Sequence, residues 1–307
     1  MPINTLEYSK LFQTALDKEA VAEMKTGWMD ANAGQVKYSG GAEVKIPKLA
    51  VSGLADYDRD SGYVQGSVTY AYETFSMTQD RGRKFQLDSM DVDETSFVPT
   101  ASAVMGEFQR TKVVPEIDAY RISKLATKAI SQSNTEYGYT PAANTVLEKI
   151  KAGIKAVKEQ GFSGSEIVVH INPDTMLQLE IRLAGNLRST TWSQGGINTT
   201  VPAIDDAALI ETPSDRMYTA ITLYDGTTSG QTAGGYVKGA SAKDVNFLVV
   251  GRRVPVAVTK QDKMRIFDPN TYQPADAWAM DYRRYHDIWV FENRSDAIFA
   301  NIKDAQS

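Results

Sequence analysis

The alternation of hydrophobic and polar residues predicts two extended strands near the start of the chain. In EVKIPKLAV (residues 43–51) apolar side chains recur about every second position, which is the period of a strand. A second strand, in YVQGSVTYAYETFSM (residues 63–77), is expected to carry one face of apolar side chains, Val64, Val68, Tyr70 and Tyr72. An acidic turn at residues 56–62 separates the two, so the pattern predicts a long antiparallel hairpin. Because an isolated hairpin is marginal in water, we expect a neighbouring subunit to cover it.

Helical spacing marks three further segments. Residues 4–30 have an amphipathic helical pattern and precede a break, so they are expected to form an arm. Residues 101–108 and 122–130 keep the same spacing on either side of Pro115, which should kink or divide the helix. If this helix is continuous, it is roughly 45 Å long at ~1.5 Å per residue.

The second half of the chain mixes strands and helices. Thr140-Pro141 predicts a helix that stops at Gly161, followed by a strand at 166–171 and a helix after Asn172-Pro173. Residues 185–203 and 225–242 are rich in Gly, Ser, Thr and Asn, and they are expected to form loops. The apolar run at 245–250 predicts a central strand, and residues 252–302 are expected to be mostly β. The fold class is therefore α+β.

The composition removes much of the chemistry that enzymes use. The chain of 307 residues has no cysteine, which excludes disulfides, thiolate metal sites and cysteine nucleophiles. It has two histidines, of which His170 lies in an apolar run and is expected to be buried and hydrogen-bonded. Residues 56–62 imitate a calcium loop, but Ser61 stands where that loop needs glycine, so a solvated acidic turn is the better interpretation.

Charge and hydrophobicity limit the partners. Hydrophobic residues make up 42% and charged residues 23%, as in an ordinary globular protein, and no apolar run approaches the ~18 residues of a membrane helix. The net charge of −5 argues against binding nucleic acid through bulk charge. No motif for a phosphate or a cofactor is present, so we expect no cofactor and no catalytic or metal residues.

The order of these parts resembles one family. Residues 80–88 (DRGRKFQLD), 91–95 (DVDET) and 113–121 (VVPEIDAYR) are similar to the junction of extended loop and spine helix in the major capsid proteins of tailed double-stranded-DNA bacteriophages. Residues 167–179 resemble the family's strand-turn-helix, and residues 245–301 resemble its C-terminal half. The resemblance covers nearly the whole chain and implies the HK-ninety-seven-like capsid fold.

The resemblance implies a division of the chain into five segments. These are an N-terminal arm (1–35), an extended loop or β-hairpin (36–96), the spine helix of the peripheral domain (97–139), the axial domain (140–260) and the C-terminal strands of the peripheral domain (261–307).

The function implied is structural: self-assembly into hexamers and pentamers of an icosahedral head. The head would enclose double-stranded DNA without gripping it strongly. Scaffolding, portal and decoration proteins are the other expected partners, and assembly in the host cytoplasm would end in the virion capsid. Because the chain starts almost at the arm, we expect a separate scaffolding protein or an already matured chain.

Contacts between subunits are expected at the hairpin and just after it, where aromatic residues favour an interface core and alternating charges can fix register. The candidate contact residues are Val64, Val68, Tyr70, Tyr72, Arg81, Arg83, Lys84, Asp88, Asp91 and Asp93. Two alternatives remain open: an encapsulin-type shell, which shares the fold but encloses enzyme cargo, and a hydrolase or metal enzyme whose site forms only in the fold.

Overall fold

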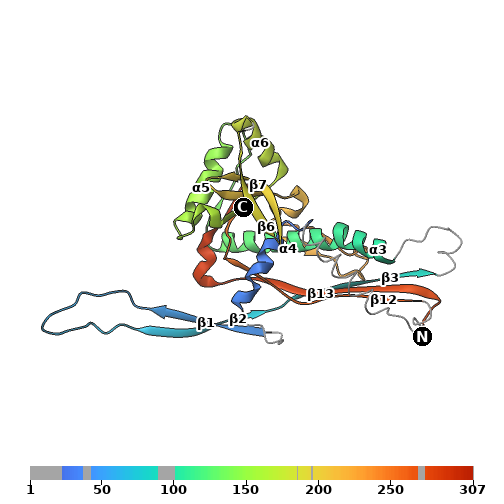
Figure 1. Cartoon of the computed structure of the whole chain (residues 1–307), viewed down its shortest axis with the longest axis horizontal. Coiled ribbons are helices and arrows are strands. Elements are labelled where there is room, and N and C mark those ends of the chain that lie inside the picture. Colours follow the sequence, from blue (N-terminus) through green and yellow to red (C-terminus); the bar gives the residue numbers. More distant parts are fainter. Residues whose placement is uncertain are drawn as a thin grey trace.

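A long helix lies between the two main parts of the molecule, a wedge of sheet and helices on one side and a ribbon of long strands on the other (Figure 1). The computed structural model describes residues 23–36, 43–88, 101–184, 186–194, 196–268 and 274–306. The expected helix at residues 4–30 falls mostly outside this range. Its described end forms instead a 3-10 helix, η1 (Gly27–Gln35).

The long helix is one run with a change of winding in its middle. It consists of α3 (Ala101–Phe108), a π-helical segment η2 (Gln109–Val113) and α4 (Val114–Ser131). Pro115 stands in the first turn of α4, where its missing N–H leaves no hydrogen bond unmade within that helix. The helical run therefore continues through Pro115, which does not divide it, and the regular α-helix is interrupted only by the π-helical segment before α4.

The wedge is built on a seven-stranded sheet in the order β4-β14-β11-β5-β8-β7-β6. Helices α5 and α6 pack on it, and both contact β11. Fully buried Leu, Ile, Val and Phe side chains from the sheet, α4 and α5 form the main core. The bounds are β4 (Thr135–Glu136), α5 (Val146–Lys158), η3 (Gly164–Glu166), β5 (Ile167–Ile171), α6 (Pro173–Leu183), β6 (Arg188–Gln194), β7 (Ile197–Ile204), β8 (Ala207–Glu211), β11 (Val245–Gly251) and β14 (Ile298–Ile302).

The ribbon is a three-stranded antiparallel sheet in the order β12-β13-β3. Its bounds are β3 (Gln79–Asp88), β12 (Pro255–Phe267) and β13 (Ala277–Val290). The remaining short elements are η4 (Ser214–Arg216), the strand pair β9 (Ile221–Leu223) and β10 (Tyr236–Lys238), and η5 (Glu292–Ala297).

The predicted hairpin is present and projects away from the rest of the molecule (Figure 1). Strands β1 (Glu43–Val51) and β2 (Val68–Ser76) pair antiparallel over their full lengths. Val64 does not share the face of the other three candidates on β2, because it lies in the connection before the strand begins. The side chains alternate between the two faces, with a period of two residues, only from Val68 onward.

The structure corrects three other expectations. Residues 188–204 form the hairpin β6–β7 and not a loop, because Gln194 pairs with Ile197 and Trp192 is buried. The helix expected from Thr140-Pro141 begins at Val146, after a turn in which the Ala142 carbonyl accepts from the Thr145 N–H. The segment 261–307 divides between the two sheets, since β14 pairs with β11 and not with the ribbon.

The other expectations for the second half hold. Strand β5, helix α6 and the central strand β11 lie where the pattern predicts, and the Asn172 side chain accepts a hydrogen bond from the Thr175 N–H at the start of α6. The expected loop at 225–242 contains only the three-residue strand β10.

Candidate assembly site

Four polar residues in the first turns of α4 hold distant segments of the chain: two bind the N-terminal segment, one binds β3 and one binds β13. Asp118 is fully buried, and its carboxylate accepts from the Lys25 N–H (3.0 Å), the Thr26 N–H (2.9 Å), the Thr26 hydroxyl (2.6 Å) and the Arg216 guanidinium (2.9 Å). Four donors compensate the cost of removing this charge from water. Asp118 therefore fixes where the N-terminal segment joins the helix.

Arg121 holds the same N-terminal segment one turn later. Its guanidinium, fully buried, makes a two-pronged ion pair with Asp30 at 2.7 and 3.1 Å and donates to the Thr26 carbonyl at 3.0 Å. The planar fork of arginine suits this paired geometry.

Tyr120 points to the ribbon of long strands. Its hydroxyl donates to Asp287 on β13 at 2.8 Å, and burial raises the pKa of the phenol well above its usual range. Asp287 also accepts from the backbone and side chain of Thr78, in the two-residue link between β2 and β3. The base of the hairpin is thereby tied to the long helix.

Glu116 holds β3. It forms a two-pronged ion pair with Arg81, with N–O distances of 2.7 and 3.0 Å. The same guanidinium donates to the carbonyls of Tyr224 and Gly235. Arg81 was expected to contact another subunit, but in this chain its fork is occupied by internal partners.

The hairpin has two chemically different faces. In an antiparallel pair, residues directly opposite one another point to the same side. The pairs Val44–Phe75 and Ile46–Glu73 turn toward the body, where Val44, Ile46 and Phe75 pack against Trp289. We call these three apolar residues the inner face. Lys48 adds an ion pair to Glu292, which holds the hairpin in one orientation.

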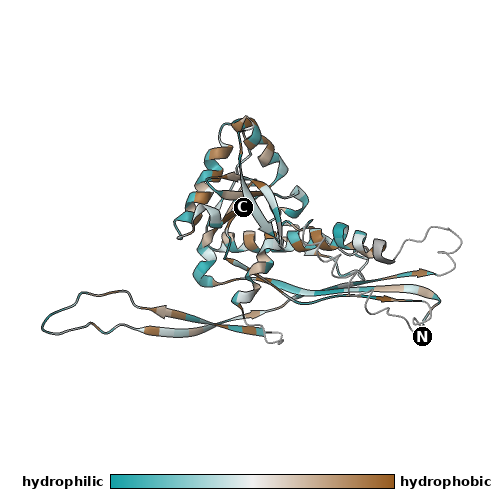
Figure 2. Ribbon diagram, viewed as in Figure 1, coloured by the Kyte–Doolittle hydropathy of each residue, from teal (hydrophilic) through white to brown (hydrophobic). Residues whose placement is uncertain are grey.

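The opposite side of the hairpin is apolar and exposed to solvent. Three successive cross-strand pairs form this outer face: Pro47–Tyr72, Leu49–Tyr70 and Val51–Val68. The exposed fractions are 62% for Leu49, 66% for Val51, 70% for Val68, 58% for Tyr70 and 61% for Tyr72. The rings of Tyr70 and Tyr72 contact each other edge to face, with centroids 5.1 Å apart. Figure 2 shows hydrophobic positions on the hairpin, which projects away from the two main parts of the molecule.

The structure places most of the other candidate contact residues and brings only some together. Val64 is exposed in the hairpin connection. Arg83, Lys84 and Asp88 lie on β3, and Arg83 donates to the Thr232 carbonyl of the same chain at 3.1 Å. Asp91 and Asp93 fall outside the described residues. That these residues contact another subunit stays a prediction.

Both histidines are buried inside the fold. The ring of His170 accepts from the Trp28 indole N–H at 3.2 Å, and its other nitrogen lies 3.1 Å from the Thr212 hydroxyl. Burial lowers the pKa of His170 to about 3, so the ring is neutral at physiological pH. Within the described part of the chain, no group of three or more His, Asp or Glu residues is placed to hold a metal ion.

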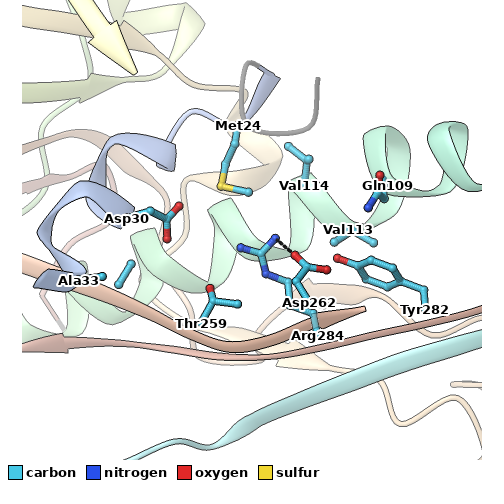
Figure 3. A pocket seen from close by; sticks show the side chains of 11 residues that line it. Met24, Asp30, Ala33, Gln109, Val113, Val114, Thr259, Asp262, Tyr282 and Arg284 are labelled. Atoms are coloured by element: carbon cyan, nitrogen blue, oxygen red, sulfur yellow. Dashed lines mark ion pairs between the residues drawn. The ribbon is translucent and has the colours of Figure 1, made fainter. Parts of the chain in front are cut away.

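A cavity of about 320 Å³ lies where η1, the π-helical segment and the ribbon meet (Figure 3). Arg284 and Asp262 form an ion pair within it, with an N–O distance of 3.0 Å. Burial raises the pKa of the Asp262 carboxyl, and the neighbouring Arg284 guanidinium acts in the opposite direction. Gln109, the first residue of η2, also lines the cavity.

Among the described helices, none combines the length and the apolar character needed to span a bilayer.

The inner face and the holding roles of Asp118, Arg121 and Glu116 were not predicted from the sequence. The partners of Asp118, Arg121 and Glu116 lie 35 to 98 residues away along the chain, so no local pattern reveals them. One signal was available: charged residues on the buried side of an amphipathic helix are rare unless they are paired.

No family model and no curated protein matches this sequence. Solved structures do match. A chain of Mycobacterium phage Che8 is 12% identical, with a TM-score of 0.59 over 90% of this chain and 92% of that one. A chain of the cyanophage P-SCSP1u capsid is 11% identical, with a TM-score of 0.58 over 89% and 86%. A chain of the mature capsid of bacteriophage PhiM1 is 11% identical, with a TM-score of 0.55 over 86% and 82%. The chain therefore has the fold of these phage proteins, two of which come from capsids, and this is the HK-ninety-seven-like fold that its sequence resembles.

Proposed function

We propose that this protein is a major capsid protein that assembles through its hairpin into the shell of a tailed double-stranded-DNA phage. The observation that carries the proposal is the outer face of the hairpin. It is a continuous stripe of five large apolar side chains and Pro47, on an element that projects beyond both cores. Contiguous exposed apolar surface of this kind marks an interaction site in a soluble protein.

The way the hairpin is anchored supports a contact with a second copy of the chain. The inner face and the Lys48–Glu292 pair hold the base of the hairpin against its own subunit. The hairpin therefore does not fold back to bury its outer face on the same chain. A neighbouring copy is the partner that a closed shell always supplies.

The segments of the subunit then take the roles that the family resemblance implies. We assign the arm to 1–35, the extended loop to 36–96, the spine helix to 97–139, the axial domain to 140–260 and the peripheral C-terminal strands to 261–297, with β14 joined to the axial sheet. Weak contacts repeated over many hexamers and pentamers stabilise a shell through multivalency. The role is non-catalytic.

The remaining partners follow from the same proposal. The net charge of −5 suits a container from which DNA is released, and virion is the expected location after assembly in the host cytoplasm. Scaffolding, portal and decoration proteins are the further expected partners.

Two matched double variants test the proposal. Leu49→Ser with Tyr70→Ser removes one cross-strand pair of the outer face. Ala50→Ser with Thr69→Ser changes the next pair along, which points to the opposite side and is also exposed. We expect both subunits to keep the thermal stability of the unaltered chain. Only the first should lose large particles in sedimentation and electron microscopy.

Equal assembly of the two variants would contradict the proposal. Particles that contain a specific protein cargo and no nucleic acid would favour the encapsulin alternative. A small stable monomer that turns over a substrate would favour an enzyme.

A further inference from the structure

Two arginines of β3 reach from the base of the hairpin to the loop that connects β9 and β10, residues 224–235. Arg81 and Arg83 are two residues apart on one strand, so their side chains point to the same side. Gly82 between them faces β13, where an added Cβ would lie 2.7 Å from the Tyr282 carbonyl oxygen. In the sequence Arg-Gly-Arg, the glycine therefore allows a close contact with β13 on one side of the strand. The two arginine side chains project from the other side.

Arg81 joins three elements through one guanidinium. Its Nε and one Nη hold Glu116 on α4, its other Nη donates to the Tyr224 carbonyl at 2.8 Å, and a longer bond of 3.3 Å reaches the Gly235 carbonyl. Tyr224 and Gly235 also bond to each other through their backbones. Arg81 therefore sits at the point where the loop closes.

The loop is shaped around these arginines. Arg83 donates to the Thr232 carbonyl, and a Cβ added at Gly226 would lie 2.9 Å from its guanidinium. Asp225 accepts from the N–H groups of Thr227 and Thr228 and from the Thr228 hydroxyl. The loop so held presents exposed residues 227–230 at its tip.

The same strand is the direct continuation of the hairpin. Only two residues separate β2 from β3, and the second, Thr78, is tied to Asp287 and through it to Tyr120. A force on the hairpin would reach Arg81 along a strand paired throughout with β13.

We infer that Arg81 couples the base of the hairpin to loop 224–235 through the long helix. We call this set of contacts made by Arg81 the latch. The loop keeps its conformation because the guanidinium fork holds its two ends and Glu116 at once. This inference goes beyond the proposed function, since the latch acts within a single subunit.

Hydrogen exchange of the unassembled, full-length subunit tests the latch. Arg81→Lys keeps the charge but loses the fork that bonds three partners. We expect amides of residues 224–235 to exchange at least tenfold faster in this variant. Arg283→Lys is the matched control, because Arg283 makes an equally two-pronged, solvent-exposed pair with Asp80, whose side chain points to the opposite face of β3 from Arg81.

A second variant keeps the test informative if Arg81→Lys folds poorly. Glu116→Gln removes the ion pair but leaves the loop carbonyls available to Arg81, so exchange in the loop should rise by less than in Arg81→Lys and more than in Arg283→Lys. Unchanged loop exchange in Arg81→Lys, or equal exchange in the Arg81 and Arg283 variants, would overturn the latch. Either result leaves the capsid proposal standing, because the experiment involves no assembly.

Discussion

At the scale of single residues, the stretch from Glu116 to Arg121 joins several distant segments of the subunit to the long helix. Its polar side chains bind the N-terminal segment, β3 and β13, while Ile117 and Ala119 of the same turns are buried apolar residues. A helix whose charged groups are all paired can be buried on several sides without leaving an uncompensated charge. This stretch belongs to the motif on which the family resemblance rests.

Asp118→Asn should destabilise the subunit by about 3 kcal/mol. The asparagine removes the negative charge that compensates Arg216 and can no longer accept all four hydrogen bonds. Denaturant unfolding of the unassembled subunit measures the change.

The control is Asp80→Asn, which breaks the solvent-exposed pair with Arg283. Exposed ion pairs contribute less than ~1 kcal/mol. Equal losses in the two variants would contradict the buried role assigned to Asp118.

His170 makes the stability of the subunit depend on pH. Its pKa is about 3 in the folded state against 6.5 in the unfolded chain, so the unfolded state binds more protons between these values. Stability from this group is complete above pH 6.5 and is lost as the pH falls toward 3. His170→Gln, which can still accept from Trp28, should reduce the drop in unfolding free energy between pH 7 and pH 5 by about 2 kcal/mol.

The remaining slope in that variant would come from His286 and from carboxyl groups. Burial lowers the pKa of His286 as well, so it acts in the same direction. A variant with the same pH dependence as the unaltered chain would show that His170 titrates normally in the fold.

At the scale of elements, the sequence predicted those parts whose pattern is set locally. The hairpin β1–β2, strand β5 with helix α6, and the central strand β11 each have a clear period, a cap or an apolar run. The hairpin β6–β7 was missed because its residues are mostly polar and small, and only its place beside β8 at the edge of the sheet makes it a strand pair. The π-helical segment spans only five residues, too few for a periodic pattern to distinguish its winding from that of an α-helix.

The tip of the hairpin should be dispensable for folding. Ser52 and Ser67 bond to each other through backbone and side chains, which closes the pairing of the strands below the connection. Replacing residues 53–66 by Asn-Gly should therefore leave the melting temperature of the subunit within a few degrees and reduce the yield of particles. Differential scanning calorimetry and sedimentation of the same preparation measure both.

If the chain with this deletion did not fold, that result would contradict the claim that the hairpin is stable without its tip. Full assembly would show that the connection plays no part in contacts between subunits, and would limit the interface to the outer face.

At the scale of the whole molecule, the large apolar residues are divided between buried cores and one exposed face of the hairpin. This division explains how a chain of ordinary composition can have a projecting hairpin. The wedge and the ribbon bury most of their own large apolar residues, whereas the outer face leaves five large ones in water. Sequence patterns indicated that the hairpin needs cover, but the direction of each face depends on the anchoring by Trp289 and Glu292, which lie more than 200 residues away. The sequence therefore predicted the element, and only the fold showed which of its faces is apolar and exposed.

Electron cryo-microscopy of the assembled particle tests the central claim most directly. The account predicts a shell in which the outer face of each hairpin is buried against a neighbouring copy, with Leu49 and Tyr70 within ~4 Å of its side chains. A particle in which the hairpins point into solvent, or in which contacts run only through the wedge, would contradict it.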